Sequence, residues 1–211
     1  MKQVVFLLGL AIGWSQTGFA ADANLTGDVA AGKNNSVACG VCHGADGNSA
    51  AASFPKLAGQ GERYLVKQMV DIRDGARTVP TMAGQLDGKS DQDLADIAAY
   101  YAAQTRSGGQ TDPELLALGE KVYRSGVAER SVAACSACHS PTGNGNAPAG
   151  FPALGGQHAQ YTAATLRAYR KGYEDASGRT NDGDAQIMRI TAFGLSDGEI
   201  DAVSSYIAGL K

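Results

Sequence analysis

Apolar residues along this chain return at helical spacing, and no stretch alternates between apolar and polar residues as a strand would. The clearest case is the series Leu94, Ile97 and Tyr101, which recurs every three or four positions. Ser90 precedes this run and Asp93 stands three positions after Ser90, which is the arrangement of a capping box. A helix is therefore predicted to begin just after Ser90.

A second helix of the same kind is predicted after Ser196. Glu199 stands three positions later, and Ile200, Val203 and Ile207 repeat the apolar spacing. The chain therefore carries two copies of one helical element, which suggests an internal duplication.

The duplication extends over most of the chain. The segment FPKLAGQ at 54–60 returns as FPALGGQ at 151–157, 97 positions later. Beyond a polar stretch at 175–184 the offset becomes 106, so the second copy carries a nine-residue insertion there. Its Gly- and Asp-rich composition predicts a solvated loop. The expected fold is all-α, with two tandem domains.

Further helices and boundaries follow from caps, glycine stops and composition. The segment Thr105–Gln110 has the composition of a linker, so we place the domains at 21–106 and 112–211 with the linker at 107–111. The other predicted helices are one within 26–38, one started by a capping box at Thr111–Glu114, one at 60–73 ended by Gly75, and one at 157–170 ended by Gly172.

The first 20 residues have the pattern of an export signal. Lys2 gives the positive start, Val4–Trp14 the apolar region, and small residues lead to a cleavage site after Ala20. The apolar region is eleven residues long, whereas a bilayer span needs about 20. We expect residues 1–20 to be removed and the mature protein to be exported.

The charge is slightly acidic and evenly distributed. The formal net charge is −3, with eight basic and ten acidic residues in 21–108 and nine and eleven in 109–211. This distribution argues against a nucleic-acid partner, because such proteins carry a basic surface.

The chemistry is concentrated in a cysteine–histidine motif that occurs twice. The sequence CGVCH at 39–43 returns as CSACH at 135–139, and the pattern C-x-x-C-H is typical of covalent c-type haem attachment. A zinc site is the alternative, but it would require the two distant motifs to converge on one metal. We expect two haem c groups, attached through Cys39, Cys42, Cys135 and Cys138, with His43 and His139 as iron ligands.

The second iron ligand must come from few candidates. The duplication pairs Met82 with Met188, each in an expected loop before a terminal helix, and this pair is the predicted choice. Met69 aligns with Leu166 inside a middle helix and is predicted to be a core residue. His158 aligns with a glycine and is expected to be exposed or locally bonded. Iron held by His and Met has no open position, which favours electron transfer over catalysis.

Four further pairs of polar residues occupy equivalent positions in the two halves. They could bind haem propionates or line a domain interface, or they could be ordinary surface and packing residues. These pairs are Gln60/Gln157, Tyr64/Tyr161, Arg73/Arg170 and Tyr100/Tyr206.

With these motifs the chain resembles the dihaem cytochrome c4 family over its whole mature length. The resemblance implies two class I cytochrome c domains packed about a pseudo-twofold axis. It also implies that the carbonyls of Pro55 and Pro152 accept hydrogen bonds from His43 and His139.

The same resemblance implies a function. Members of the family are periplasmic carriers that pass electrons from the cytochrome bc complex to terminal oxidases or other reductases, some of them loosely attached to the membrane. We therefore expect a monomeric periplasmic electron carrier rather than an enzyme.

Two other functions stay open at this point. A dihaem peroxidase or a thiosulfate dehydrogenase would need an open iron site. A tethered subunit of a redox complex would need a retained membrane anchor.

Overall fold

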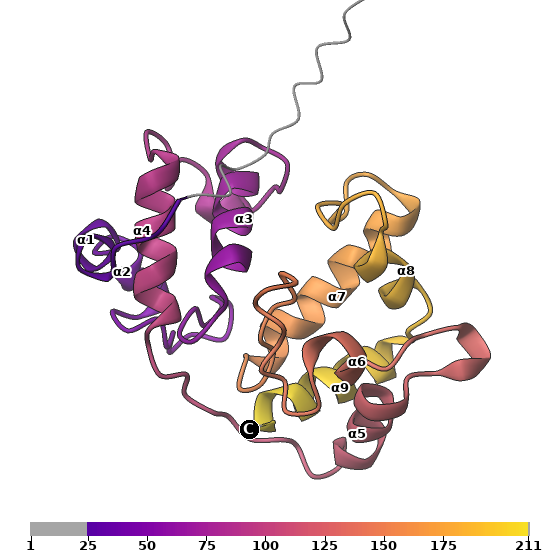
Figure 1. Cartoon of the computed structure of the whole chain (residues 1–211). Coiled ribbons are helices and arrows are strands. Elements are labelled where there is room, and N and C mark those ends of the chain that lie inside the picture. Colours follow the sequence, from indigo (N-terminus) through magenta and orange to yellow (C-terminus); the bar gives the residue numbers. More distant parts are fainter. Residues whose placement is uncertain (1–24, 211) are drawn as a thin grey trace, which may run out of the picture.

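The chain forms two helical bundles, one after the other, joined by an extended segment (Figure 1). The computed structural model describes residues 25–210, so the predicted export signal lies outside the described residues. The first bundle contains α1 (Val29–Asn35), α2 (Gly40–His43), α3 (Glu62–Arg73), the 3-10 turn η1 (Pro80–Met82) and α4 (Asp91–Ala102). The second contains α5 (Leu116–Ser125), η2 (Ala128–Arg130), α6 (Ser136–His139), α7 (Ala159–Glu174), α8 (Ile187–Phe193) and α9 (Asp197–Gly209).

The predicted all-α tandem fold is confirmed. Within residues 25–210 the only β-type pairings are two isolated bridges, Val127 with Val132 and Asn146 with Phe151. No helix in the described part of the chain is long and apolar enough to span a membrane.

Both bundles are built in the same way. In each, the last helix packs against the first helix and against the middle helix: α4 contacts α1 and α3, and α9 contacts α5 and α7. The predicted apolar positions of α4 and α9 are buried in two separate cores. The amphipathic pattern of the terminal helices therefore identifies the centre of each domain.

The capping boxes that start α4 and α9 are confirmed. The Ser90 hydroxyl accepts a hydrogen bond from the Asp93 N–H, and the Asp93 carboxylate accepts one from the Ser90 N–H. Ser196 and Glu199 form the same pair at α9. Such caps satisfy backbone donors that the helix itself leaves free, and each contributes about 1 kcal/mol.

Two glycines that the sequence analysis did not single out allow the first and last helices to cross closely. A Cβ atom on Gly32 would lie 1.9 Å from the Asp96 carbonyl oxygen, and one on Gly119 would lie 2.2 Å from the Ala202 carbonyl oxygen. Both distances are shorter than any van der Waals contact. Only glycine fits at these crossings.

The capping box predicted at Thr111–Glu114 is wrong. Helix α5 begins at Leu116, and no side chain caps its first turn. The Asp112 carboxylate instead accepts from the Glu114 N–H, and the Thr111 hydroxyl reaches the Tyr206 carbonyl. These side chains stabilise a turn against α9 rather than a helix start.

The helix stop predicted at Gly172 is also wrong, because α7 continues to Glu174. Gly172 is buried, and a Cβ there would lie 2.1 Å from the Arg179 carbonyl oxygen. The glycine therefore accommodates the inserted segment, which folds back onto α7. By contrast, α3 ends at Arg73 and Gly75 follows with a φ of +82°, as predicted.

The helix crossing leads to a stability prediction. Gly119→Ala should lower the free energy of unfolding by about 2 kcal/mol, because the new methyl group overpacks a backbone contact. Gly198→Ala is the matched control, since nothing lies within 4 Å of a Cβ at that helical position. It should be neutral or stabilising by up to about 1 kcal/mol. Urea unfolding of both variants measures the difference, and equal midpoints would contradict the close crossing.

Candidate functional site

Each C-x-x-C-H segment folds as a single helical turn that places its two thiols and its imidazole on one short element. Helix α2 is Gly40–His43 and helix α6 is Ser136–His139, and the first cysteine of each motif stands at the N-cap. Both histidines are 7% exposed, whereas Cys42 is exposed and the other three cysteines are half-buried. The thiols are thus more accessible than the imidazoles.

Each histidine is held by one backbone carbonyl. The His43 Nδ1 lies 2.9 Å from the Pro55 oxygen, and the His139 Nδ1 lies 2.9 Å from the Pro152 oxygen. A carbonyl oxygen only accepts hydrogen bonds, so Nδ1 carries the proton in both rings. This tautomer leaves a lone pair on Nε2, the atom that would bind iron.

The surroundings of the histidines favour the neutral, metal-binding form. Burial lowers the pKa of His43 and of His139, and the bond to the proline carbonyl only partly opposes this effect. Burial also raises the pKa of the Cys39 thiol, and it raises that of Cys135 to about 11. The first thiol of each motif therefore has little thiolate character at neutral pH.

The donor set fits haem c and does not fit zinc. Each site offers one imidazole and two thiols on one turn, and the two motifs lie in different bundles. Among residues 25–210 no group of three or more His, Cys, Asp or Glu side chains could hold a metal ion. In haem c the porphyrin itself binds the iron, so each site would need only its imidazole and one further protein ligand.

The two candidate methionines lie in helical turns rather than in the expected loops. Met82 ends the 3-10 turn η1, is half-buried, and lines a cavity of about 190 Å³. Met188 is the second residue of α8 and packs against the second core. Met69 packs against the first core from α3, as predicted, and its counterpart Leu166 is buried in the second.

Contrary to the expectation that it is exposed or locally bonded, His158 is half-buried and bonds to the other bundle. Its Nε2 lies 3.0 Å from both the hydroxyl and the carbonyl oxygen of Ser49 in the other bundle. This side chain therefore belongs to the contact between the bundles.

The contact between the bundles is centred on two equivalent glutamines. Gln60 donates to the Ala153 carbonyl at 2.9 Å and accepts from the Ala153 N–H at 2.8 Å. Gln157 makes both bonds to the backbone of Lys56, each 2.9 Å long. Both glutamine side chains are 8% exposed. Of the alternatives open for Gln60 and Gln157, the structure therefore supports a role in the interface between the domains.

The glycine before each glutamine makes this placement possible. Gly59 has a φ of +63° and Gly156 a φ of +77°, a left-handed region that side chains other than glycine rarely adopt. The G-Q ending of the repeated segment thus combines a backbone turn with an amide that faces the other domain.

A second interface cluster corrects part of the prediction that 175–184 is a solvated loop, because 175–177 and 183–184 are exposed but Arg179 and Asn181 are not. Arg179 and Asn181 are each 8% exposed, and both donate to the Gln68 amide oxygen of the first bundle. Arg77 donates to the same oxygen at 2.8 Å and also reaches the Tyr161 hydroxyl of the second bundle. Within the described residues, neither arginine forms an ion pair with a carboxylate.

Most of the remaining equivalent pairs have packing roles. Arg73 bonds the Lys89 carbonyl and the Asp91 carboxylate at the start of α4. Arg170 bonds the Leu195 carbonyl and the Asp197 carboxylate at the start of α9. Of the pair Tyr100/Tyr206, the first donates to the Ala45 carbonyl and the second packs in the second core.

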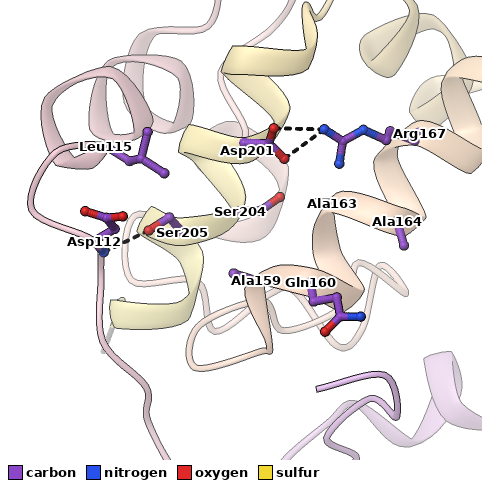
Figure 2. Close-up of a pocket in the computed structure, with 10 residues that line it drawn as sticks. All are labelled: Asp112, Leu115, Ala159, Gln160, Ala163, Ala164, Arg167, Asp201, Ser204 and Ser205. Carbon is purple, nitrogen blue, oxygen red and sulfur yellow. Dashed lines mark hydrogen bonds and ion pairs between the residues drawn. The ribbon is translucent and has the colours of Figure 1, made fainter. Parts of the chain in front are cut away.

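One cavity of the second bundle contains none of the predicted site residues. It has a volume of about 590 Å³ and lies between α7 and α9, with Arg167 paired to Asp201 at its edge (Figure 2). Its lining includes Ser204 and Ser205 but no histidine or cysteine. The serines therefore have no imidazole base, and neither C-x-x-C-H motif opens into this cavity.

Comparisons with known proteins agree with this arrangement. A family model described as cytochrome c matches residues 29–103 and 117–211. The chain is 56% identical over 193 residues to cytochrome c4 of Pseudomonas aeruginosa, covering 92% of this chain and 94% of that one. It is 38% identical over 184 residues to a thiosulfate dehydrogenase electron acceptor of Stutzerimonas stutzeri, covering 82% and 79%.

A solved structure shows the same architecture. Reduced recombinant cytochrome c4 from Pseudomonas stutzeri matches with a TM-score of 0.84 at 52% identity, covering 88% of this chain and 100% of that one. Together with the two histidine turns, this likeness shows that the chain belongs to the cytochrome c family, in its cytochrome c4 branch, and is an electron-carrying c-type cytochrome.

Proposed function

We propose that this protein carries two covalent haem c groups, one in domain 21–106 and one in domain 112–211, and relays electrons between redox proteins of the periplasm. The observation that carries the proposal is the pair of histidines whose Nδ1–H groups are fixed by proline carbonyls. Such a bond sets the ring orientation that an iron ligand needs.

The residues of each domain have assigned roles in this proposal. Cys39 and Cys42 attach the first haem, and Cys135 and Cys138 attach the second. The backbone carbonyls of Pro55 and Pro152 orient the imidazole rings of His43 and His139, respectively. Met82 and Met188 complete the iron coordination. When bound, haem c supplies an iron that cycles between the ferric and ferrous states. A histidine and a methionine leave no open position, which favours a carrier over an enzyme.

The arginines between the domains are suited to hold the anionic propionate groups. Arg77 and Arg179 share the Gln68 amide oxygen, so two positive charges lie close together in a partly buried place. Burial alone raises the pKa of Tyr161, but Arg77, Arg179 and hydrogen bonds outweigh it and lower the pKa overall. A positive field of this kind is balanced by an anion.

The contact between the domains supports transfer from one haem to the other within one protein. The 107–111 linker is hydrogen-bonded to both domains. Lys56 Nζ of the first domain donates to the Ser107 carbonyl at 3.1 Å, and the Gly109 N–H donates to the Ala208 carbonyl of the second domain at 3.0 Å. Electrons are proposed to enter at one domain and leave from the other.

The proposed partners are the cytochrome bc complex as donor and a terminal oxidase or another reductase as acceptor. The export-type N-terminus supports a periplasmic location, with loose membrane attachment consistent with these partners. The similarity to a protein named thiosulfate dehydrogenase electron acceptor supports a dehydrogenase as a second class of donor.

A reconstitution experiment tests the function. The mature protein should be reduced by a purified bc complex with quinol and reoxidised by a haem–copper oxidase. Electrons should pass from quinol to oxygen only when the mature protein is present. Stopped-flow absorbance follows both steps. If neither complex exchanges electrons with it while a small chemical mediator does, the proposed partners are wrong.

The number of haems is tested by mass. Intact mass spectrometry of the mature protein should show two covalent haems, and Cys39→Ala combined with Cys42→Ala should leave one. Cys135→Ala with Cys138→Ala is the matched variant and should remove the other. A single haem on the unaltered protein would contradict the proposal.

The second iron ligands are tested by spectroscopy. Met188→Ala should remove the near-infrared Fe–Met band of one haem. It should also lower the reduction potential of that haem, because methionine ligation raises the potential and alanine offers no ligand in its place. Met82→Ala should do the same to the other haem. Met69→Leu is the control and should preserve both bands, since Met69 packs in the core. Loss of a band in the control would reassign the ligand of the first haem.

A further inference from the structure

Each glutamine bridge ends on the peptide group that also holds the histidine of the other domain. Gln60 Oε1 accepts from the Ala153 N–H at 2.8 Å. The carbonyl of the same peptide group belongs to Pro152, and it accepts from His139 Nδ1 at 2.9 Å. An uninterrupted chain of hydrogen bonds therefore runs from the first domain to the histidine of the second.

The mirror arrangement is also present. Gln157 Oε1 accepts from the Lys56 N–H at 2.9 Å. The carbonyl of that peptide group belongs to Pro55, which accepts from His43 Nδ1 at 2.9 Å. The two chains of bonds cross the interface in opposite directions.

We propose that Gln60 and Gln157 are positioning residues that tune the reduction potential of the haem in the opposite domain. Gln60 acts on the haem of His139, and Gln157 acts on the haem of His43. This inference rests on the proposed ligation of iron by the two histidines.

The physical link is polarisation of the shared amide. A hydrogen bond accepted from the N–H draws electron density toward the carbonyl oxygen, and hydrogen bonds in series strengthen one another by perhaps 10–30% in condensed phase. The Pro152 oxygen then attracts the Nδ1 proton of His139 more strongly. An imidazole with a more loosely held Nδ1 proton is a more basic ligand, which favours ferric iron and lowers the potential.

Burial makes the effect local and strong. The two glutamines are 8% exposed and the two histidines 7%. Water therefore competes little for these groups, and the low dielectric strengthens each bond.

The orientation of each amide is fixed by additional bonds. Gln60 Nε2 donates to the Ala153 carbonyl, and Gln60 Oε1 also accepts from the N–H of Gly61 in its own domain at 3.0 Å. Gln157 Oε1 accepts in the same way from the His158 N–H. These contacts keep the oxygen, rather than the NH₂ group, facing the peptide N–H of the other domain.

A purely adhesive role for the glutamines predicts a different result from tuning. Loosening the interface would affect both haems, or the haem of the altered domain. Tuning through the shared peptide group predicts a change in the opposite domain only.

The test uses the holoprotein with Gln60→Leu and, separately, Gln157→Leu. Redox titration followed by the haem methyl resonances in NMR gives one potential for each assigned haem. Gln60→Leu should shift the redox equilibrium constant of the C-terminal haem about threefold toward the ferrous state. At 59 mV per tenfold change, the reduction potential rises by about 30 mV. The N-terminal haem should stay unchanged, and Gln157→Leu should give the reverse pattern.

Two further variants keep the test decisive. His158→Leu removes the ring contacts to Ser49 across the same interface and touches neither shared peptide group, so it should produce no crosswise shift. Gln60→Met keeps the length of the side chain but removes the acceptor oxygen that faces the Ala153 N–H, so it should raise the C-terminal potential as Gln60→Leu does. This variant decides the question if the leucine variants fail to fold.

The outcomes separate this inference from the function on which it rests. Equal shifts of both haems, a shift confined to the altered domain, or no shift at all would overturn the tuning role. The absorption spectrum of the unaltered protein reports the ligation itself: without two low-spin haems the proposed ligation fails, whatever the glutamines do.

Discussion

The hydrogen bond from a buried imidazole Nδ1 to a proline carbonyl determines how each domain must be arranged. The ring needs a fixed tautomer, so the segment that carries the proline has to pass directly beside the C-x-x-C-H turn. A proline supplies an acceptor there without adding a competing N–H of its own. The helices α4 and α9, with their capped starts and buried apolar faces, hold this segment in place through backbone hydrogen bonds. Gly59 N–H donates to the Tyr101 carbonyl of α4, and Gly156 N–H donates to the Ile207 carbonyl of α9.

The features that could be predicted from the sequence are those decided by near neighbours in the chain. The capping boxes at Ser90 and Ser196 form because serine and the acidic residue three positions on satisfy each other's backbone. The C-x-x-C-H turns and the buried faces of α4 and α9 are local in the same sense. The duplication then extended each local prediction to the other domain.

The predictions that failed depended on distant contacts. Thr111 and Asp112 match a capping pattern, but their side chains bond to α9 and to the adjoining turn. Arg179 and Asn181 lie in a segment of loop-like composition, yet the first domain buries them. Composition describes a segment in water, so it does not reveal that another domain covers it.

The glutamine bridges bond to backbone atoms of the facing domain and not to its side chains. The facing residue is lysine in one domain and alanine in the other, and both are accommodated because each offers the same N–H and C=O. Recognition of this kind is indifferent to the identity of the facing residue, with proline as the exception, because it lacks the N–H. After a gene duplication the two halves could therefore diverge in sequence at this contact while remaining docked in one geometry.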